Sequence, residues 1–176
     1  MRKKPVTIIL SLLATLTLLF GGWFFYQKME VEGPVRAQFE QMKSAELADL
    51  RVEPEQIVVK LKVNDPGAFP EEYKATLEQI EQRVQEKELN VTILNDNKDL
   101  KAVWDSGIFA FTEAVELHQY SKIPVLLESW KEQFGLTAVT SQMDETHIYV
   151  NLQRGDQHFY VMVPRVLGQE EVTSNG

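Results

Sequence analysis

The chain has 176 residues, and its hydrophobic content of 44% is sufficient for a folded core in addition to an apolar N-terminal run. It has no cysteine, which excludes disulfide bonds, a thiolate nucleophile and a cysteine-based metal site. Three of the 18 basic residues and none of the 26 acidic ones precede residue 27, so the remainder has 15 basic against 26 acidic residues. Its net charge of −11 argues against nucleic acid and anionic lipid as partners.

The first predicted element is a membrane-spanning helix at residues 5–26. This run has no charged residue, and as a helix it measures roughly 33 Å, enough to cross a hydrocarbon core of about 30 Å. It is longer than the apolar region of a secretory leader. Its only small pair, Gly21-Gly22, leaves a bulky residue at one of the two cleavage positions. We therefore expect an uncleaved anchor in contact with membrane lipid.

Residues on both sides of the run predict its orientation. Basic residues are concentrated before it, with Arg2, Lys3 and Lys4 preceding the run and only Lys28 closely following it. By the positive-inside rule, residues 1–4 are cytoplasmic and the rest of the chain is extracytoplasmic. An aromatic cluster suited to a membrane interface ends the run: Trp23, Phe24, Phe25 and Tyr26. Residues 27–34 are expected to form a linker.

Residues 35–165 are predicted to form an α+β domain, with helices on one face of a mostly antiparallel sheet. Residues 35–96 indicate the order α-β-β-α-β, with helices near 34–47 and 70–89 and strands near 50–52, 57–63 and 90–96. The second strand alternates apolar and polar residues. The second helix repeats apolar residues at spacings of four, three and four: Tyr73, Leu77, Ile80 and Val84.

Residues 97–165 predict a second submodule of order α-α-β-β-β. The helices are expected at 98–119 and 122–135, and the strands at 136–142, 147–153 and 157–164. Gly107 inside the first helix costs about 1 kcal/mol relative to alanine, which indicates a bend or a close helix contact there. Residues 166–176 are too polar to fold and are expected to be a disordered tail.

The last two strands allow a prediction of register. Gly155-Asp156 suits a two-residue type II′ turn because glycine comes first. This turn places three apolar pairs on one face: Leu152 with Phe159, Val150 with Val161, and Ile148 with Val163. The other face is mixed, and pairs Gln153 with His158, Asn151 with Tyr160, and Tyr149 with Met162.

The sequence contains no assembled catalytic or metal-binding motif. It lacks a Gly-x-Ser-x-Gly nucleophile motif and a glycine-rich phosphate loop. His147 and His158 project from one face of the predicted hairpin, but they are separated by roughly 20 Å along it, too far to share a metal. His118 lies near a helix end. We therefore expect no enzyme activity, no cofactor and no metal.

Aromatic residues gather in the two middle helices and the last hairpin. Most are expected to be core residues, but two segments are apolar on more than one side and could meet another chain. The candidate interaction surface consists of Trp104, Phe109 and Phe111 from the helix and Tyr149, Tyr160 and Met162 from the hairpin.

The element order of residues 35–96 resembles that of the ring-building modules of bacterial envelope secretion and sporulation machines. Those modules are often single-pass anchored and extracytoplasmic, so the resemblance implies a role in assembly. We predict a non-catalytic protein of the bacterial cell envelope, anchored in the membrane, whose exterior domain binds a protein partner or itself. The alternative is an extracytoplasmic binding module for a small molecule or a cell-wall glycan, with the aromatic clusters lining a groove that contains Trp104 or Trp130.

Overall fold

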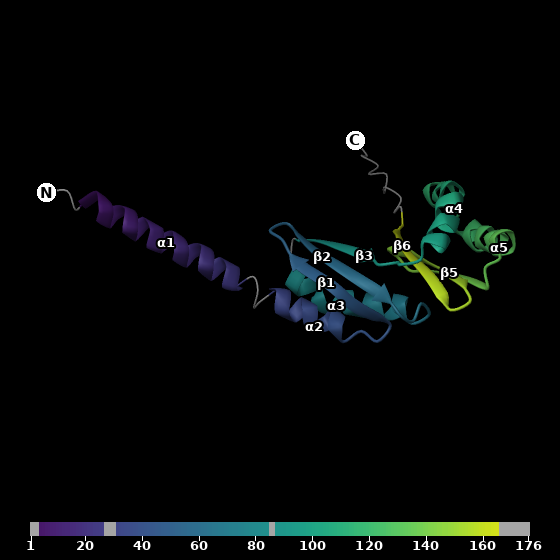
Figure 1. Cartoon of the computed structure of the whole chain (residues 1–176), viewed down its shortest axis with the longest axis horizontal. Helices are drawn as coiled ribbons and strands as arrows, with labels where there is room; N and C mark the ends of the chain where they lie inside the picture. The colour runs from purple at the N-terminus through teal and green to yellow at the C-terminus, as the bar shows by residue number, and fades with distance from the viewer. Residues whose placement is uncertain (1–3, 27–30, 85–86, 166–176) are drawn as a thin grey trace, which may run out of the picture. The chain divides into compact units, whose positions relative to one another are not determined.

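The computed structural model describes residues 4–26, 31–84 and 87–165 (Figure 1). The chain is divided into two compact units. The first unit consists of residues 1–61 and 71–92, and the second of residues 62–70 and 93–176. Residues 62–70 therefore belong with the second half of the chain, an arrangement that the linear pattern does not reveal.

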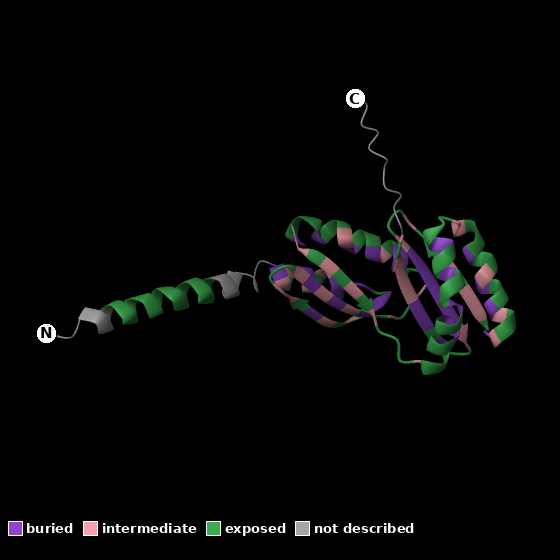
Figure 2. Ribbon diagram, turned by 90° about the horizontal axis from the view of Figure 1, so that it is seen from above, coloured by how far each residue is buried: buried purple, intermediate pink, exposed green. Residues whose placement is uncertain are grey.

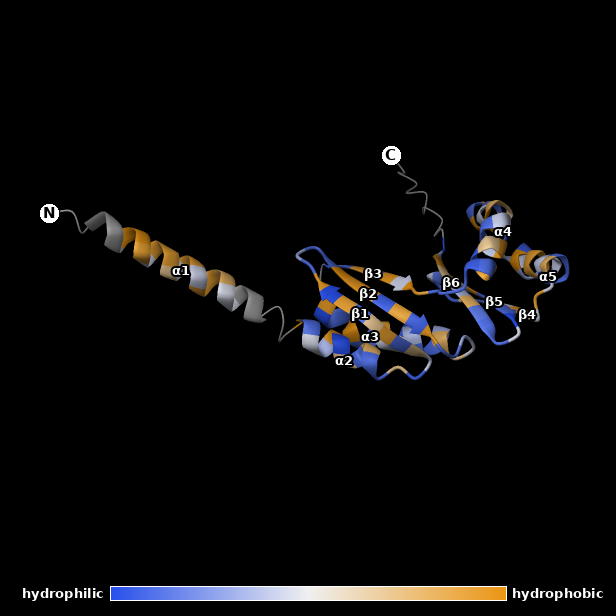
Figure 3. Cartoon of the chain, viewed as in Figure 1, coloured by the Kyte–Doolittle hydropathy of each residue, from blue (hydrophilic) through white to orange (hydrophobic). Residues whose placement is uncertain are grey.

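Helix α1 spans Lys4–Tyr26, and its side chains are described over residues 8–22. Most of these are apolar and all are exposed (Figure 3). Over the part of the chain that the structure describes, no helix combines the length and the apolar character needed to cross a membrane. Arg2, Lys3 and the predicted tail 166–176 lie outside the described residues, as do the side chains of Lys4 and of residues 23–26.

The next five elements have the predicted order α-β-β-α-β. They are α2 (Gly33–Glu40), β1 (Ala45–Val52), β2 (Gln56–Val63), α3 (Phe69–Val84) and β3 (Glu88–Ile93). The three strands form one sheet in the order β1-β2-β3. The N–H of Glu88 donates to the carbonyl of Glu55 at 3.0 Å, so β3 and β2 begin at the same end of the sheet and run parallel.

Helix α2 is shorter than predicted. It ends at Glu40 rather than near residue 47, and β1 begins at Ala45, five residues before the expected strand. The backbone N–H groups of Lys43 and Ser44 donate to the Glu72 carboxylate at 2.9 and 2.7 Å, which turns the chain out of the helix. The sequence pattern places Glu72 only at a helix start and gives no sign of this long-range bond.

The core of the first unit follows the predicted apolar faces. In β2, Ile57, Val59 and Leu61 are fully buried, while the residues between them are partly exposed (Figure 2). Helix α2 buries Val35 and Phe39, and α3 buries three of the four residues of its apolar stripe, the exception being the partly exposed Leu77. The alternation with period two and the spacing of three and four therefore predicted the buried faces.

The second unit contains an antiparallel sheet of β4 (Ala138–Met143), β5 (His147–Arg154) and β6 (Gln157–Pro164). The predicted register of the last hairpin is confirmed at every pair from Ile148 with Val163 to Arg154 with Gln157. Gly155 has φ +59°, and no positive φ occurs at Asp156. This combination is the one that a type II′ turn requires.

Two helices cover the apolar face of this sheet. They are α4 (Lys98–Glu116) and α5 (Ile123–Phe134), joined through the short 3-10 helix η2 (Tyr120–Lys122). One continuous core includes Leu100 and Phe111 from α4, Leu127 from α5, and Val150 and Leu152 from β5. Helix α4 is capped by Asn97, whose side chain accepts from the Leu100 N–H at 2.9 Å.

Gly107 marks a close contact between the two helices. A Cβ atom at this position would lie only 2.0 Å from Cζ2 of Trp130 on α5. Trp130 is itself buried and packs edge-on against Trp104, with ring centroids 6.0 Å apart. Glycine is therefore required by the tryptophan ring, and the close helix contact predicted from the sequence is confirmed.

The α+β class is confirmed, and the structure adds that the strands form two sheets rather than one. In the second unit the helices lie on one face of an antiparallel sheet, with α5 against β4 and α4 against β5 and β6. The second face of this sheet, which has mixed and aromatic residues, is therefore not covered by α4 and α5.

Candidate functional site

Most of the candidate interaction residues are buried in the second unit, Trp104 and Phe111 in its helical core and Tyr149 and Tyr160 on the opposite face of the sheet. Trp104, Phe111, Tyr149 and Tyr160 are all buried, with 7% or less of their surface exposed. Met162 is partly exposed, and Phe109 alone is fully exposed, at 85%. In this conformation four of the six side chains are too buried to form the surface of a protein–protein interface.

The second face of the β4-β5-β6 sheet is covered by Phe69. This residue begins α3 but belongs to the second unit. Its ring meets those of Tyr149 and Tyr160 edge-on, with centroids 6.2 and 5.3 Å apart. These T-shaped pairs cover the second face of the sheet with apolar ring surface. The sequence pattern alone did not show whether this face belonged to the core or to an interface.

The two buried tyrosines differ in the hydrogen bonding of their hydroxyl groups. The Tyr149 hydroxyl donates to Oδ2 of Asp144 at 2.7 Å. The Tyr160 hydroxyl is buried and has no hydrogen-bond partner among the described residues. Burial raises the pKa of Tyr160, so its hydroxyl remains protonated and able to donate at physiological pH.

Asp144 organises the turn between β4 and β5. Its Oδ1 accepts from the N–H groups of Thr146 and His147, each at 2.7 Å, in addition to the bond from Tyr149. Burial opposes ionisation of Asp144, but these hydrogen bonds outweigh it and lower the pKa of the carboxyl. Burial also lowers the pKa of His147, against the attraction of the Asp144 charge. Each bond is local to the turn, so the cluster has a structural explanation.

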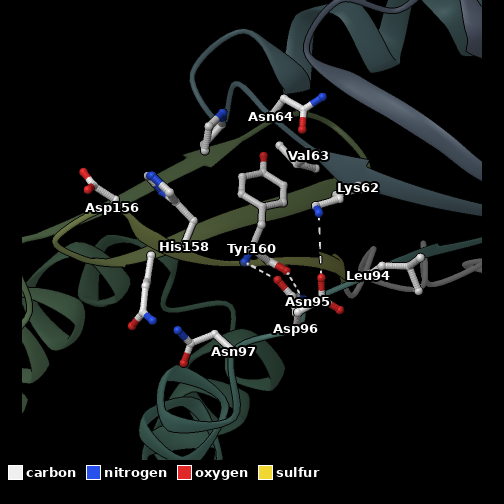
Figure 4. A pocket seen from close by; sticks show the side chains of 12 residues that line it. Lys62, Val63, Asn64, Leu94, Asn95, Asp96, Asn97, Asp156, His158 and Tyr160 are labelled. Carbon is white, nitrogen blue, oxygen red and sulfur yellow. Dashed lines mark hydrogen bonds and ion pairs between the residues drawn. The ribbon is translucent and has the colours of Figure 1, made fainter.

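A polar cleft of about 450 Å³ lies beside Tyr160 (Figure 4). Its lining residues all belong to the second unit and come from three chain segments: Lys62, Val63, Asn64 and Pro66; Leu94, Asn95, Asp96 and Asn97; and Asp156, Gln157, His158 and Tyr160. Its volume falls in the range of small-molecule sites. The cleft therefore forms where the end of β2, the residues just after it and the residues after β3 meet the turn and first residues of β6 in the last hairpin.

Asn95 holds one wall of the cleft in place. Its side-chain amide donates to the Tyr160 carbonyl, and its side-chain oxygen accepts from the Tyr160 N–H, both at 2.8 Å. One asparagine side chain thus makes the pair of bonds that a neighbouring strand would make with β6. Lys62 and Asp96 form an ion pair at 3.7 Å across the same region.

The outward faces of α4 and α5 each expose a large apolar side chain, and these side chains are the second candidate for a functional surface. Phe109 lies opposite the buried stripe of α4, and Val125, 72% exposed, lies opposite the buried stripe of α5. We call these two residues the outer helical patch. The neighbours of Phe109 one turn away are all exposed and none is a large apolar residue: Asp105, Ser106, Thr112 and Glu113.

The three histidines each contact different residues. Nδ1 of His158 lies 3.3 Å from Oδ1 of Asn151, and Nδ1 of His147 lies 2.8 Å from the Thr146 hydroxyl. His118 has a left-handed backbone, with φ 55°, and its ring stacks edge-on against Tyr120. Within residues 4–26, 31–84 and 87–165, no group of three potential ligands is placed to hold a metal ion.

The sequence did not predict the cleft. Its polar residues fall on turns and strand ends, where solvent exposure is the ordinary reading of asparagine and aspartate. The only sequence signal was Tyr160 on the mixed face of the hairpin. Trp104 and Trp130, proposed as lining for a groove, lie instead in the helical core.

Comparison with known proteins gives no relative. No family model matches the chain, and neither a curated protein nor a solved structure matches it.

Proposed function

We propose that this chain is a non-catalytic, membrane-anchored protein of the bacterial cell envelope whose extracytoplasmic domain binds a second protein. The observation that supports this proposal is the outer helical patch, above all Phe109 with 85% of its surface exposed. Full burial of a phenylalanine side chain contributes about 1.5–3 kcal/mol. A contact centred on Phe109 therefore supplies a tenfold or greater gain in affinity.

Charge around the patch favours a foreign partner over self-association. The ion pairs of Lys101 with Asp105 at 2.6 Å and of Lys131 with Glu128 at 2.7 Å are each neutral, and the exposed Glu113, one turn from Phe109, adds a negative charge. Two copies of an acidic face repel each other when they meet. The partner that fits has an apolar socket for Phe109 surrounded by lysine or arginine residues.

The anchor is part of the same proposal. The exposed apolar side chains of α1, from Ile8 to Phe20, require a covering that water does not supply. The uncharged run at residues 5–26 fits lipid as that covering, with residues 1–4 in the cytoplasm. Tethering at the membrane then confines the domain to the layer in which it meets its partner.

Photocrosslinking in cells tests the partner. A photoreactive amino acid is placed in the full-length chain at Phe109, at Val125, and at Glu81, an exposed position on α3 of the first unit. We expect one foreign protein to be captured from Phe109 and Val125 but not from Glu81. With the photoreactive group kept at Val125, Phe109→Asp should reduce capture at least tenfold.

Two results would refute the interaction proposal. One is capture of another copy of the chain, which replaces the foreign partner by self-association. The other is equal capture with and without Phe109→Asp, which shows that the patch is not the contact. Raised salt should also weaken capture, because the contact includes screened charges.

Membrane attachment is tested independently of the partner. We expect the full-length chain to remain in the membrane pellet after an alkaline carbonate wash, and a C-terminal reporter enzyme to be active only outside the cytoplasm. Replacement of Leu12 and Leu16 by lysine should release the chain into the soluble fraction. A chain that is soluble without these changes would contradict the anchor.

A further inference from the structure

We propose that the polar cleft beside Tyr160 binds a neutral, polyhydroxylated ligand, a sugar unit, and that the Tyr160 hydroxyl donates a hydrogen bond to it. This inference is separate from the partner contact at Phe109, because it uses the second face of the β4-β5-β6 sheet. It assigns a ligand class to a site that shares no residue with the outer helical patch.

The buried hydroxyl of Tyr160 is the first observation. Only 4% of the surface of Tyr160 is exposed, and its hydroxyl oxygen has no hydrogen-bond partner among the described residues. Figure 4 shows the hydroxyl end of the ring directed toward Val63 and away from Asn95. A buried donor without a partner costs folding free energy, and a ligand oxygen in the cleft would recover it.

Tyr149 shows that this condition is not imposed by the fold. It lies on the same face of the same sheet, meets the same Phe69 ring, and its hydroxyl is bonded to Asp144 at 2.7 Å. Of these two tyrosines on one sheet face, only Tyr160 has a hydroxyl without a partner among the described residues, and Tyr160 is the one that lines the cleft.

The polar groups around Tyr160 suit sugar hydroxyls. Asn64, Gln157 and His158 combine hydrogen-bond donors with acceptors, which is what a ring of hydroxyl groups requires from a site. Asn95 is already engaged on both sides by the Tyr160 backbone, so it shapes the cleft and does not contribute to binding.

The charges in the cleft argue against an anionic ligand. The one cation, Lys62, already faces Asp96 at 3.7 Å, and Asp156 adds a second negative charge to the lining. A phosphate or carboxylate would meet this net negative charge with no unpaired cation to offset it. A neutral ligand avoids that repulsion and still uses the side-chain amides of Asn64 and Gln157.

The test measures binding to the full-length protein in lauryldimethylamine oxide, a detergent without a sugar head group. Saturation-transfer NMR titrations use N-acetylglucosamine, its β-1,4-linked tetrasaccharide, and inorganic phosphate as a charged control. Two variants are compared with the wild type, Tyr160→Phe and Tyr149→Phe, each of which removes a single buried hydroxyl. The melting temperature of each protein is measured without ligand.

We expect sugar binding that weakens about tenfold in Tyr160→Phe, whose melting temperature stays unchanged or rises because no native bond is lost. Tyr149→Phe should show the opposite pattern, a lower melting temperature with unchanged affinity. A tetrasaccharide that binds tighter than the monosaccharide identifies a glycan as the source, and equal affinities identify a free sugar. The inference is overturned if neither sugar binds, if phosphate binds instead, or if Tyr160→Phe leaves the affinity unchanged.

Discussion

Gly107→Ala is expected to destabilise the second unit although alanine is the better helix former. The substitution gains about 1 kcal/mol of helix propensity. Against this, the new Cβ would lie 2.0 Å from Cζ2, 2.3 Å from Cε2 and 2.5 Å from Cη2 of Trp130. Overpacking of a core costs about 1–3 kcal/mol and occasionally more. Because Trp130 is buried and held edge-on by Trp104, the severe end of that range applies, and we expect a net loss of about 2 kcal/mol.

Urea unfolding of the full-length chain, followed by near-ultraviolet circular dichroism, measures this loss. A loss of about 2 kcal/mol lowers the midpoint by roughly 1 M urea. Ser106→Ala is the matched control, since it leaves the same methyl side chain at an exposed position one residue away. It removes only an exposed hydroxyl that donates to the Ala102 carbonyl, and it should change stability little. In Gly107→Ala/Trp130→Phe the smaller ring should recover part of the loss. If Gly107→Ala were as stable as the wild type or more so, the proposed packing of α4 against α5 would be refuted.

Two further predictions concern the strands of the second unit. Asp144→Asn should lower stability at neutral pH by about 1 kcal/mol, allowing for solvent screening of a partly exposed group. Because the folded pKa of Asp144 is lowered, its contribution is present above the unfolded value of about 3.9 and is lost as the pH falls through the folded pKa. Urea midpoints of the variant and the wild type should therefore converge in acid, and a constant difference down to about pH 2 would contradict the assignment. Gly155→Ala should cost about 1 kcal/mol because φ is +59°, whereas Gly67→Ala, with only an ordinary 3.4 Å contact to Asp65, should cost less, and equal costs would argue against the left-handed turn.

Local sequence patterns predicted much of the fold because those features depend on residues that are close together in the sequence. The order of elements, the buried face of β2 and the register of the last hairpin each follow from residue spacing or from one turn. The end of α2 was missed because it depends on Glu72, a carboxylate 28 residues beyond Ser44 that binds the backbone there. A hydrogen bond between residues so far apart in the sequence does not appear in the periodic pattern of apolar and polar residues.

The candidate sites were less predictable for a related reason. Phe109 could be identified because it breaks the polar pattern of an outward helical face, which is a local property. The cleft depends on residues 62–66 meeting the last hairpin, and no local pattern in those residues predicts that they do so. An exposed asparagine and a cleft-lining asparagine have the same sequence surroundings.

The comparison of the two buried tyrosines decides which polar groups of the second unit are explained by folding alone. Asp144 accepts from the Tyr149 hydroxyl and from the N–H groups of its own turn, so removal of the Asp144 carboxylate leaves the buried Tyr149 hydroxyl without this partner. Tyr160 has no such dependence at its hydroxyl, while its backbone is fixed by Asn95. A residue whose position is determined by the fold but whose hydroxyl contributes nothing to it is free to change to phenylalanine without a stability cost. The role proposed for this hydroxyl in the cleft gives it a hydrogen-bond partner that the described residues do not supply.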